Sequence, residues 1–359
     1  MLPRVAIIYL CHGNLRHIPE VVASWASLTY PKDRVIIYVV PAGSPDGIAD
    51  VIRRDVLPRS GKDLPEIILF DDGENGGFAK NNNKPMRDAL ATGVDYVYLQ
   101  NGDLRLAPDT ITTAVALAET DAKIGSVQSL VMFWNDEQRV NTDGCMIHVA
   151  GYGYARDNGK PLADIDVADG EEIPYASGAA VLYRADVLRK VGLLEEGFFM
   201  YHEDLELGLR MRVAGYTNRI ATGSKAYHDY QFSRNPKKFA WMELYRWVVM
   251  LGYYKFLTFV VLSPLLLCIE AGSWFLSVRG AGVSAKLHAY RELLRPATWR
   301  LIAGIRHRTR RLRVVGDREL MRLFTGKIEA QETSGVLMTR VVNPFVDALW
   351  RTLYRLIVW

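Results

Sequence analysis

Two adjacent carboxylates, Glu203 and Asp204, lie in the stretch of the chain whose residue types are best suited to catalysis. A run of aromatic residues precedes them, and a helical pattern of apolar residues follows. The carboxylates are therefore expected at the N-terminal end of a short helix, where the helix dipole favours the ionised form. An ionised carboxylate beside aromatic rings that exclude water is suited to act as a general base. The alternative is that both residues only cap the helix.

The segment after the carboxylates has the spacing of a short helix. Apolar residues recur four positions apart, and Gly215 stands where a helix commonly ends in glycine. Glu206 and Arg210 are also four apart, so we expect an ion pair between them on the outer side of the helix.

Two more polar segments follow predicted strands and could bind a ligand. The first reads Asn-Gly-Gly-Phe-Ala from Asn75 and opens a helix, so its small residues and free N–H groups could bind phosphate or sugar. The second, Asn101-Gly102-Asp103, places a carboxylate just beyond a buried strand, where it could hold a divalent cation on a diphosphate. The first segment alone is a weak signal, because Asn-Gly-Gly is also an ordinary turn. The second is the more telling of the two, and its alternative is a plain Asx turn.

The bulk composition is that of a folded chain with one large domain or two. It has 359 residues, of which 49% are apolar and 23% charged, and a formal net charge of +4. The three cysteines, Cys11, Cys145 and Cys268, lie far apart, which predicts neither a disulfide framework nor a zinc site and fits a reducing compartment. We expect no nucleic-acid partner, and the composition leaves the oligomeric state open.

The first hundred residues alternate between strand and helix patterns. Strands are predicted at 5–10, 34–40, 66–70 and 95–100, and helices at 18–28, 48–57 and 84–92, with a loop at 71–83. This order is typical of an α/β fold whose mostly parallel sheet binds a nucleotide at the C-terminal edge of its strands. Further strands are indicated near 125–132 and 179–183. We expect a catalytic domain over 1–230 and a helical, membrane-associating region over 231–359.

The C-terminal region is expected at the cytoplasmic face of the membrane. Residues 247–278 form an apolar stretch with only two charged residues. This stretch is longer than the ~20 residues needed to cross a membrane once and too short to cross it twice. The segment 279–313 has ten Lys or Arg residues and one acidic residue, and such basic segments usually lie on the cytoplasmic side of a membrane. The N-terminus shows no signal peptide. We favour an in-plane or re-entrant segment over a single span, with an interfacial helix at 343–359 that meets anionic lipids. The alternative is a helical subdomain packed on the core.

The order of these motifs, with Ser-Gly-Ala at Ser177 and His228 after the helix, resembles the family 2 inverting glycosyltransferases of the GT-A fold. The likeness covers roughly Val5 to Arg246 and is closest to the rhamnosyltransferase-like members that build bacterial cell-surface glycans. It implies a Rossmann-like, mostly parallel sheet with flanking helices. It also implies metal-dependent transfer of a hexose or rhamnose from a nucleotide-sugar to a glycan hydroxyl.

The resemblance assigns roles to particular residues. Asp204 would be the general base and Glu203 its partner, while Asp103 and His228 would hold Mg²⁺ or Mn²⁺. The nucleotide-sugar would be bound by residues of the loops that follow the strands: His12, Asn14, Ser44, Asp72, Asn75, Gly77, Asn83, Asn101, Gly102 and Asp103. The acceptor would be bound by Ser177, Gly178 and Tyr201.

One position departs from the family pattern. The second strand of such enzymes usually ends in an aspartate that binds the nucleotide base, and Pro41 stands there in this chain. Proline offers neither a side-chain acceptor nor an N–H. Base recognition is then expected from Asp71, Asp72 or His12, or the donor is not a pyrimidine nucleotide.

The predicted function is an inverting, metal-dependent glycosyltransferase of cell-wall or polysaccharide biosynthesis whose acceptor is a polyprenyl-diphosphate-linked glycan. One alternative is a catalytically silent, membrane-bound scaffold that binds glycan or nucleotide, which Pro41 favours. Another is a nucleotidyltransferase, but the Cys11–Asn14 loop lacks the basic, Gly-rich character that a triphosphate needs. Donor sugar, nucleotide and linkage are not indicated by the sequence.

Overall fold

The computed structural model of the chain describes residues 1–230, 236–279, 282–329 and 338–359. Its centre is a ten-stranded mixed sheet with the order β10-β12-β6-β11-β4-β1-β2-β3, to which β5 adds at β12 and β7 at β6. The strands are β1 (Val5–Leu10), β2 (Val35–Val40), β3 (Glu66–Leu69), β4 (Tyr96–Asn101), β5 (Leu104–Leu106), β6 (Ile124–Phe133), β7 (Asp136–Thr142), β10 (Glu172–Ile173), β11 (Ala180–Arg184) and β12 (Thr217–His228). A separate hairpin pairs β8 (Cys145–Ile147) with β9 (Gly153–Ala155).

The four strands predicted in the first hundred residues are confirmed, each to within one residue. β1 pairs in parallel with β2 and with β4, and β2 pairs in parallel with β3. The β-branched and aromatic side chains of β1, β2 and β4 are buried on both faces, as a covered parallel sheet requires. The loops that follow these strands therefore meet at one edge, and β11, antiparallel to β4, begins at that edge.

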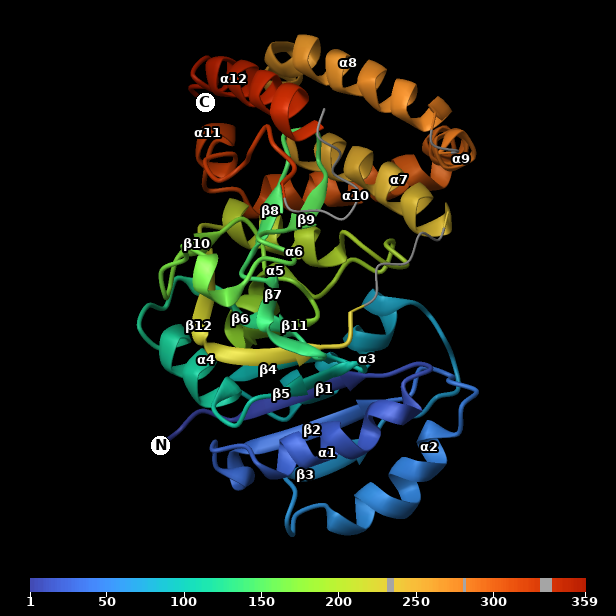
Figure 1. The fold of residues 1–359 in the computed structure, drawn as a ribbon, viewed down its shortest axis with the longest axis vertical. Coiled ribbons are helices and arrows are strands. Elements are labelled where there is room, and N and C mark those ends of the chain that lie inside the picture. Colours follow the sequence, from blue (N-terminus) through green and yellow to red (C-terminus); the bar gives the residue numbers. More distant parts are fainter. Residues whose placement is uncertain (231–235, 280–281, 330–337) are drawn as a thin grey trace.

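Helices cover both faces of the sheet (Figure 1). α1 (Ile18–Ala26), α2 (Ile48–Val51) and α4 (Thr110–Ala118) contribute to one hydrophobic cluster. α3 (Phe78–Ala91), α5 (Ala185–Val191) and α6 (Glu203–Val213) contribute to a cluster on the other face. The predicted helix after the two carboxylates is thus confirmed as α6, and Gly215 beyond it has a φ of 84°.

Helix α3 begins at Phe78, six residues before the predicted start at Lys84. The prediction treated the asparagines at 81–83 as loop residues because asparagine favours turns. In the structure all three are buried, and Asn82 donates from Nδ2 to the Phe78 carbonyl oxygen at 2.9 Å. Tertiary burial of these amides extends the helix towards the site.

The C-terminal region is a bundle of helices at the end of the molecule opposite β1–β3 (Figure 1). Its helices are α7 (Pro236–Tyr253), α8 (Phe256–Arg279), α9 (Val283–Leu293), α10 (Pro296–Leu312), α11 (Asp317–Leu320) and α12 (Asn343–Tyr354). The apolar stretch 247–278 is divided between the end of α7 and most of α8. Pro264 lies inside α8 and does not end it.

The helical bundle packs directly on α6, the helix that begins with the two carboxylates. One buried cluster combines Leu205, Leu209 and Val213 of α6 with residues of α7, α8, α10 and α12, including Val248, Leu262, Ile305 and Trp350. The bundle therefore closes one side of α6, and this contact determines what surrounds the two carboxylates.

Candidate active site

The C-terminal edge of the parallel strands brings most of the predicted site residues together. The backbone N–H of Asn101, at the end of β4, donates to the Ala179 carbonyl oxygen at 3.0 Å, which joins the Asn101–Asp103 turn to the start of β11. The turn also packs on the loop after β1, because a Cβ atom added at Gly102 would lie 2.5 Å from Asn14 Oδ1 and 2.7 Å from Cys11 Cα. Glycine is thus required at position 102.

Asp103 and His228 form a hydrogen-bonded pair just beyond β4. Asp103 Oδ1 lies 3.1 Å from His228 Nε2, and His228 Nδ1 lies 3.1 Å from Asn141 Oδ1. Antiparallel pairing of β12 with β5 places His228 opposite Leu104 and so beside the carboxylate. Burial alone would raise the pKa of Asp103, but the hydrogen bond and charge of His228 hold it below its ordinary value. Asp103 is therefore ionised at neutral pH.

The donor set at this pair fits a divalent cation held partly by substrate. Asp103 offers a carboxylate oxygen and His228 an imidazole nitrogen, and the Asp103 side chain is 32% exposed towards the edge of the sheet. Within the described residues no three His, Cys, Asp or Glu side chains gather as a complete metal-binding set. Such a two-residue set suits Mg²⁺ or Mn²⁺ whose other ligands are waters and phosphate oxygens.

Asp204 lies at the first turn of α6, against the start of β11. Its Oδ2 accepts the Gly178 N–H at 3.0 Å and its Oδ1 accepts the Leu205 N–H at 2.7 Å. Burial raises the pKa of Asp204, and these two N–H groups limit the rise. A carboxylate with a raised pKa that still receives hydrogen bonds to its ionised form can take a proton near neutral pH.

Glu203 is more deeply buried than Asp204. Its Oε2 is buried and finds no hydrogen-bond partner among the described residues. Burial, with the adjacent charge of Asp204, raises the pKa of Glu203 well above its ordinary value, so its neutral form is favoured. The pair therefore combines a proton-holding carboxyl group with a carboxylate that can accept one.

A strained turn presents these carboxylates. Tyr201 and His202 both have positive φ, 71° and 69°, which is uncommon for residues with side chains. His202 Nε2 lies 3.2 Å from the Gly151 carbonyl oxygen, and burial lowers its pKa to about 4, so the ring is neutral at pH 7. Lys238 lies over the Tyr201 ring at 4.9 Å. Strain held in place by surrounding contacts is common at functional sites.

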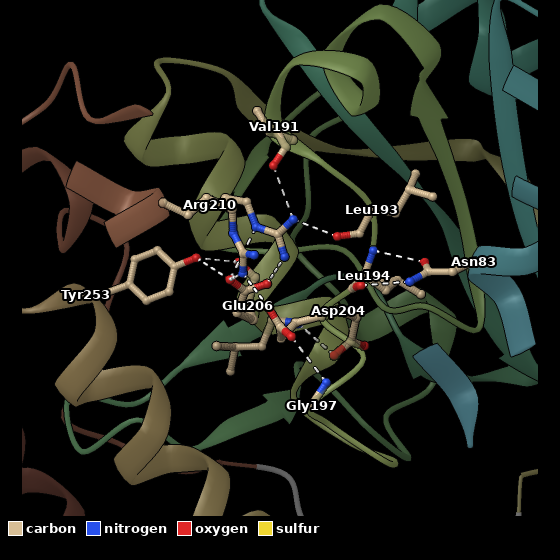
Figure 2. A network of polar contacts seen from close by, with 12 residues as sticks. Asn83, Val191, Leu193, Leu194, Gly197, Asp204, Glu206, Arg210 and Tyr253 are labelled. Carbon is tan, nitrogen blue, oxygen red and sulfur yellow. Dashed lines mark hydrogen bonds and ion pairs between the residues drawn. The ribbon is translucent and has the colours of Figure 1, made fainter. Parts of the chain in front are cut away.

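The predicted ion pair between Glu206 and Arg210 exists, but its predicted position on the outer side of the helix is wrong. The Glu206 and Arg210 side chains are 0% and 1% exposed, and they lie at the centre of a polar network (Figure 2). Arg210 also donates to the carbonyl oxygens of Val191 at 3.2 Å and Leu193 at 2.6 Å. The helical pattern of α6 gave no sign of the bundle that covers this side.

Two bundle helices complete the network around Glu206. Tyr253, at the end of α7, donates its hydroxyl to Glu206 Oε1 at 2.7 Å (Figure 2), and Arg308 of α10 lies 3.3 Å from the same oxygen. Burial alone would raise the pKa of Glu206, but Arg210, Arg308 and Tyr253 hold it below its ordinary value. The helix that carries Asp204 is thus fixed by charges from both sides.

The loops after β1 and β2 form one hydrogen-bonded unit. The predicted residue Ser44 accepts the Gly13 N–H at 2.8 Å and donates to Asp46 Oδ1 at 2.7 Å. His12 donates its backbone N–H to Asn14 Oδ1 at 2.9 Å, and its ring Nδ1 lies 3.1 Å from the Ala42 carbonyl oxygen. His12, Asn14 and Ser44 therefore lie together beside the Asn101–Asp103 turn.

The predicted donor-binding residues after β3 are Asp72, Asn75, Gly77 and Asn83, and Asn83 differs from the others in its surroundings. Asn75 Oδ1 accepts the Gly77 N–H at 3.2 Å, and Gly77 has a φ of 86°. Asp72 forms an ion pair with Lys84. Asn83 is buried, and its amide forms hydrogen bonds with the Leu194 backbone (Figure 2). The Asn83 amide also donates to the Glu196 carboxylate at 2.9 Å. Its contacts hold the loop that leads to α6.

The predicted acceptor residues lie at the start of β11 and before α6. Ser177 donates its N–H to Gln128 Oε1 at 2.9 Å, and Gly178 lies against Phe78, whose ring would be 3.0 Å from an added Cβ atom. Gly178 thus brings its N–H to Asp204 where a side chain would crowd Phe78. Tyr201, in the strained turn, is half-buried.

Several polar residues at the site were not predicted. Asp46 accepts hydrogen bonds from Ser44 and from the Leu15 N–H at 3.0 Å, and it connects the first two loops. Asp229 Oδ2 accepts a hydrogen bond from the Arg16 guanidinium at 2.7 Å and lies 3.0 Å from His17 Nε2. Asp229 follows His228 directly, which is the one sequence signal that could have marked it; the contacts of Asp46 depend on how distant loops meet.

A sheet edge with a carboxylate–imidazole pair and a second carboxylate at a helix N-terminus has the side chains that a glycosyltransferase site needs. Residues 3–249 match the family described as "Glycosyltransferase like family 2", and the chain belongs to this family. A search of curated proteins finds no match.

Solved structures of glycosyltransferases share the fold. The mannosyltransferase PcManGT from Pyrobaculum calidifontis, in complex with GDP-Man and Mn²⁺, is 17% identical with a TM-score of 0.51, over 87% of this chain and 85% of that one. S. aureus TarS 1-349 in complex with UDP-GlcNAc is 14% identical with a TM-score of 0.50, over 99% and 90%. GalNAc-T7 with UDP, GalNAc and Mn²⁺ is 11% identical with a TM-score of 0.52, over 70% of this chain and 51% of that one. The predicted GT-A fold is confirmed.

Proposed function

We propose that the protein is an inverting glycosyltransferase that moves a sugar from a nucleotide-sugar to a hydroxyl group of a glycan. The observation that carries the proposal is that an ionised Asp103, paired with His228, and a proton-accepting Asp204 lie at the same edge of a family 2 fold. The first suits a diphosphate with its cation and the second suits an acceptor hydroxyl.

The reaction is a single displacement at the anomeric carbon. Asp204 takes the proton of the acceptor hydroxyl while the hydroxyl oxygen forms a bond to that carbon. The bond from the carbon to the diphosphate oxygen breaks, and the nucleoside diphosphate leaves with the bonding electrons. Attack from the face opposite the leaving group inverts the configuration. Glu203, held neutral by burial, leaves Asp204 as the sole negative charge of the pair.

Asp103 and His228 would hold Mg²⁺ or Mn²⁺ on the diphosphate, and the cation would supply electrostatic stabilisation of the leaving group. The neighbouring structures solved with Mn²⁺ support a divalent cation. The loops carrying His12, Asn14 and Ser44 would hold the nucleotide beside them, and Ser177, Gly178 and Tyr201 would face the acceptor.

The acceptor we propose is a glycan on a polyprenyl diphosphate carrier, met at the cytoplasmic face of the membrane. The helical bundle supports this, because its basic residues could meet a diphosphate or anionic headgroups beside the catalytic helix that it covers. A rhamnose or hexose donor used in cell-surface polysaccharide synthesis fits the sequence resemblance.

A silent scaffold is the second candidate, because Pro41 leaves the usual base-binding position without a polar group. The raised pKa of the two buried carboxyl groups speaks against it, since their burial has a stability cost that a binding protein has no reason to maintain.

The test is a nucleotide-release assay on detergent-extracted protein. UDP-, dTDP- and GDP-sugars are supplied in turn with Mg²⁺ or Mn²⁺, and the Gly102→Ala variant is assayed beside the wild type and an exposed control, Asp164→Asn. We expect slow release from one donor class, lost on chelation and in Gly102→Ala, with Asp164→Asn unchanged. Metal-dependent nucleotide binding without release from any donor would replace the proposal with the scaffold.

A further inference from the structure

Between Phe256 and Val278, one side of α8 is exposed and carries no charged residue. Exposed positions recur every three to four residues, from Phe256 and Leu257 through Leu267 and Cys268 to Leu276 and Val278. Leu267 is 70% exposed and Val278 is 68% exposed. The surface helix of a water-soluble protein presents charged or polar residues on such a face. This face, which we call the outer face of α8, is therefore matched to an apolar environment.

Length and composition alone would allow α8 to cross a membrane. Among the described helices, α8 is the one that is long and apolar enough to cross a membrane, with a mean hydropathy of 1.9 over Phe256–Val278. A helix of this size would span the ~30 Å hydrocarbon core. The decision between crossing and lying flat must therefore come from the contacts of its other face.

The N-terminal half of α8 is fixed to the protein by a buried polar contact. Thr258 donates its hydroxyl to Asp317 Oδ2 at 2.6 Å, and Trp359 Nε1 donates to the Thr258 hydroxyl at 2.9 Å. Arg313 pairs with the same buried Asp317 at 2.9 Å. Leu262, one turn further on, is fully buried against the bundle.

The C-terminal half of α8 is fixed by a cluster of charges. Glu270 of α8 lies 2.5 Å from Arg246 of α7 and 2.6 Å from Lys286 of α9, and it accepts the Tyr290 hydroxyl at 2.6 Å. Glu243 of α7 completes the cluster, 2.9 Å from Lys286. The Arg246 and Lys286 side chains are 1% and 4% exposed, so these charges are enclosed by protein.

These contacts argue against α8 crossing the bilayer. There are two ways in which it could cross, and both bring charged groups into the hydrocarbon. Either it would leave its charged partners and expose Glu270 to lipid, or α7, α9 and Asp317 would enter the hydrocarbon with it. Each charged side chain at the bilayer centre has a cost of several kcal/mol in itself. Figure 1 shows α8 running across the end of the molecule beside α12, as a flat layer rather than a projecting rod.

We propose that the outer face of α8 lies in the plane of one leaflet of an anionic phospholipid bilayer and that α8 does not cross it. Phe345 on α12 and Leu356, two residues beyond the end of α12, continue this surface, and they are 63% and 58% exposed. Arg351 of α12, which pairs with Asp347 at 2.8 Å, and Arg355, the residue after α12, are exposed and border the apolar surface where anionic headgroups would lie. The inference concerns attachment and does not depend on the proposed reaction.

The cysteines of the chain allow single-site labelling once one of them is replaced. Cys268 lies on the outer face and is exposed, whereas Cys11 and Cys145 are buried. In a Cys268→Ser background, Leu257→Cys and Leu276→Cys place single labels near the two ends of α8, about 28 Å apart along the helix. Each full-length variant is labelled with a fluorophore and bound to vesicles of phosphatidylcholine with phosphatidylglycerol. Lipids carrying nitroxides at shallow or deep positions then quench the label according to its depth.

An in-plane α8 predicts similar depths at the two ends, within about one helical turn, ~5 Å. A crossing helix would place the two labels at opposite interfaces, roughly 25 Å or more apart in depth, and would overturn the proposal. Labels that are not quenched by lipid at any depth would overturn it as well, because the outer face would then lie away from the bilayer.

Vesicle sedimentation provides an independent measurement. Leu267→Glu should weaken binding at least tenfold, whereas Leu2→Glu, at an exposed leucine near the N-terminus, should leave binding unchanged. Arg355→Gln should weaken binding to anionic vesicles about fivefold and leave binding to pure phosphatidylcholine unchanged. If Leu267→Glu instead converts a dimer to a monomer while vesicle binding stays the same, the outer face binds a second copy and the proposal fails.

Discussion

Replacing Arg210 by methionine should destabilise the protein strongly, although the residue was expected on the surface. Arg210 is buried, and its removal leaves the carbonyl oxygens of Val191 and Leu193 and one side of Glu206 without a donor (Figure 2). Loss of one partner from a buried ion pair costs about 3–5 kcal/mol. Tyr253 and Arg308 still contact Glu206, so we expect the lower end, about 3 kcal/mol.

Urea unfolding followed by circular dichroism measures this free energy. The double variant Glu206→Gln with Arg210→Met should recover part of the loss, because no buried charge is then left without a partner. As a control, Arg59→Met breaks an exposed i,i+4 pair with Asp63 and should leave the midpoint unchanged. A loss below about 1 kcal/mol in Arg210→Met would show that the network does not hold α6 in place.

Three further predictions concern the same helix. Glu203→Gln should raise the stability of the protein more at pH 8 than at pH 4. The folded state raises the pKa of Glu203 and so favours its protonated form, and the wild type therefore loses stability as the pH rises through that pKa. Equal effects of the substitution at both pH values would contradict this. Gly208→Ala should lower the melting temperature, although alanine usually stabilises helices, because the added Cβ atom would lie 2.3 Å from Tyr175 Cβ; a rise would refute the packing. The rate of sugar transfer should fall as the pH is lowered, with an apparent pKa above the ~3.9 of an ordinary aspartate, because burial raises the pKa of Asp204. An apparent pKa at or below that value would argue against Asp204 as the base.

The parts of the fold that could be predicted from the sequence are those with local causes. β1, β2, β3 and β4 are short apolar runs bounded by turn residues, and each was placed within one residue. α6 was found from its apolar spacing and from Gly215. The family resemblance added the pairing of Asp103 with His228, which a sequence separation of 125 residues would not otherwise indicate.

The parts that could not be predicted depend on distant contacts. The asparagines at 81–83 have the composition of a loop and are helical because β-sheet and loop residues bury them. The Glu206–Arg210 pair has the pattern of a solvent-exposed pair and is buried because α7 and α10 cover it. The polar contacts that fix α8 to the bundle, at Thr258 and Glu270, involve partners up to 101 residues away, and no sequence pattern indicated them. In each case tertiary packing determines burial, which local spacing does not encode.

The central claim, that Asp103 holds the donor and Asp204 accepts the proton, is tested most directly by measuring donor binding and nucleotide release side by side in Asp103→Asn and Asp204→Asn. The account predicts that Asp204→Asn binds the donor with metal as the wild type does and releases nucleotide at least 100-fold more slowly. Asp103→Asn should lose metal-dependent binding itself. Release from Asp204→Asn at the wild-type rate would contradict the account.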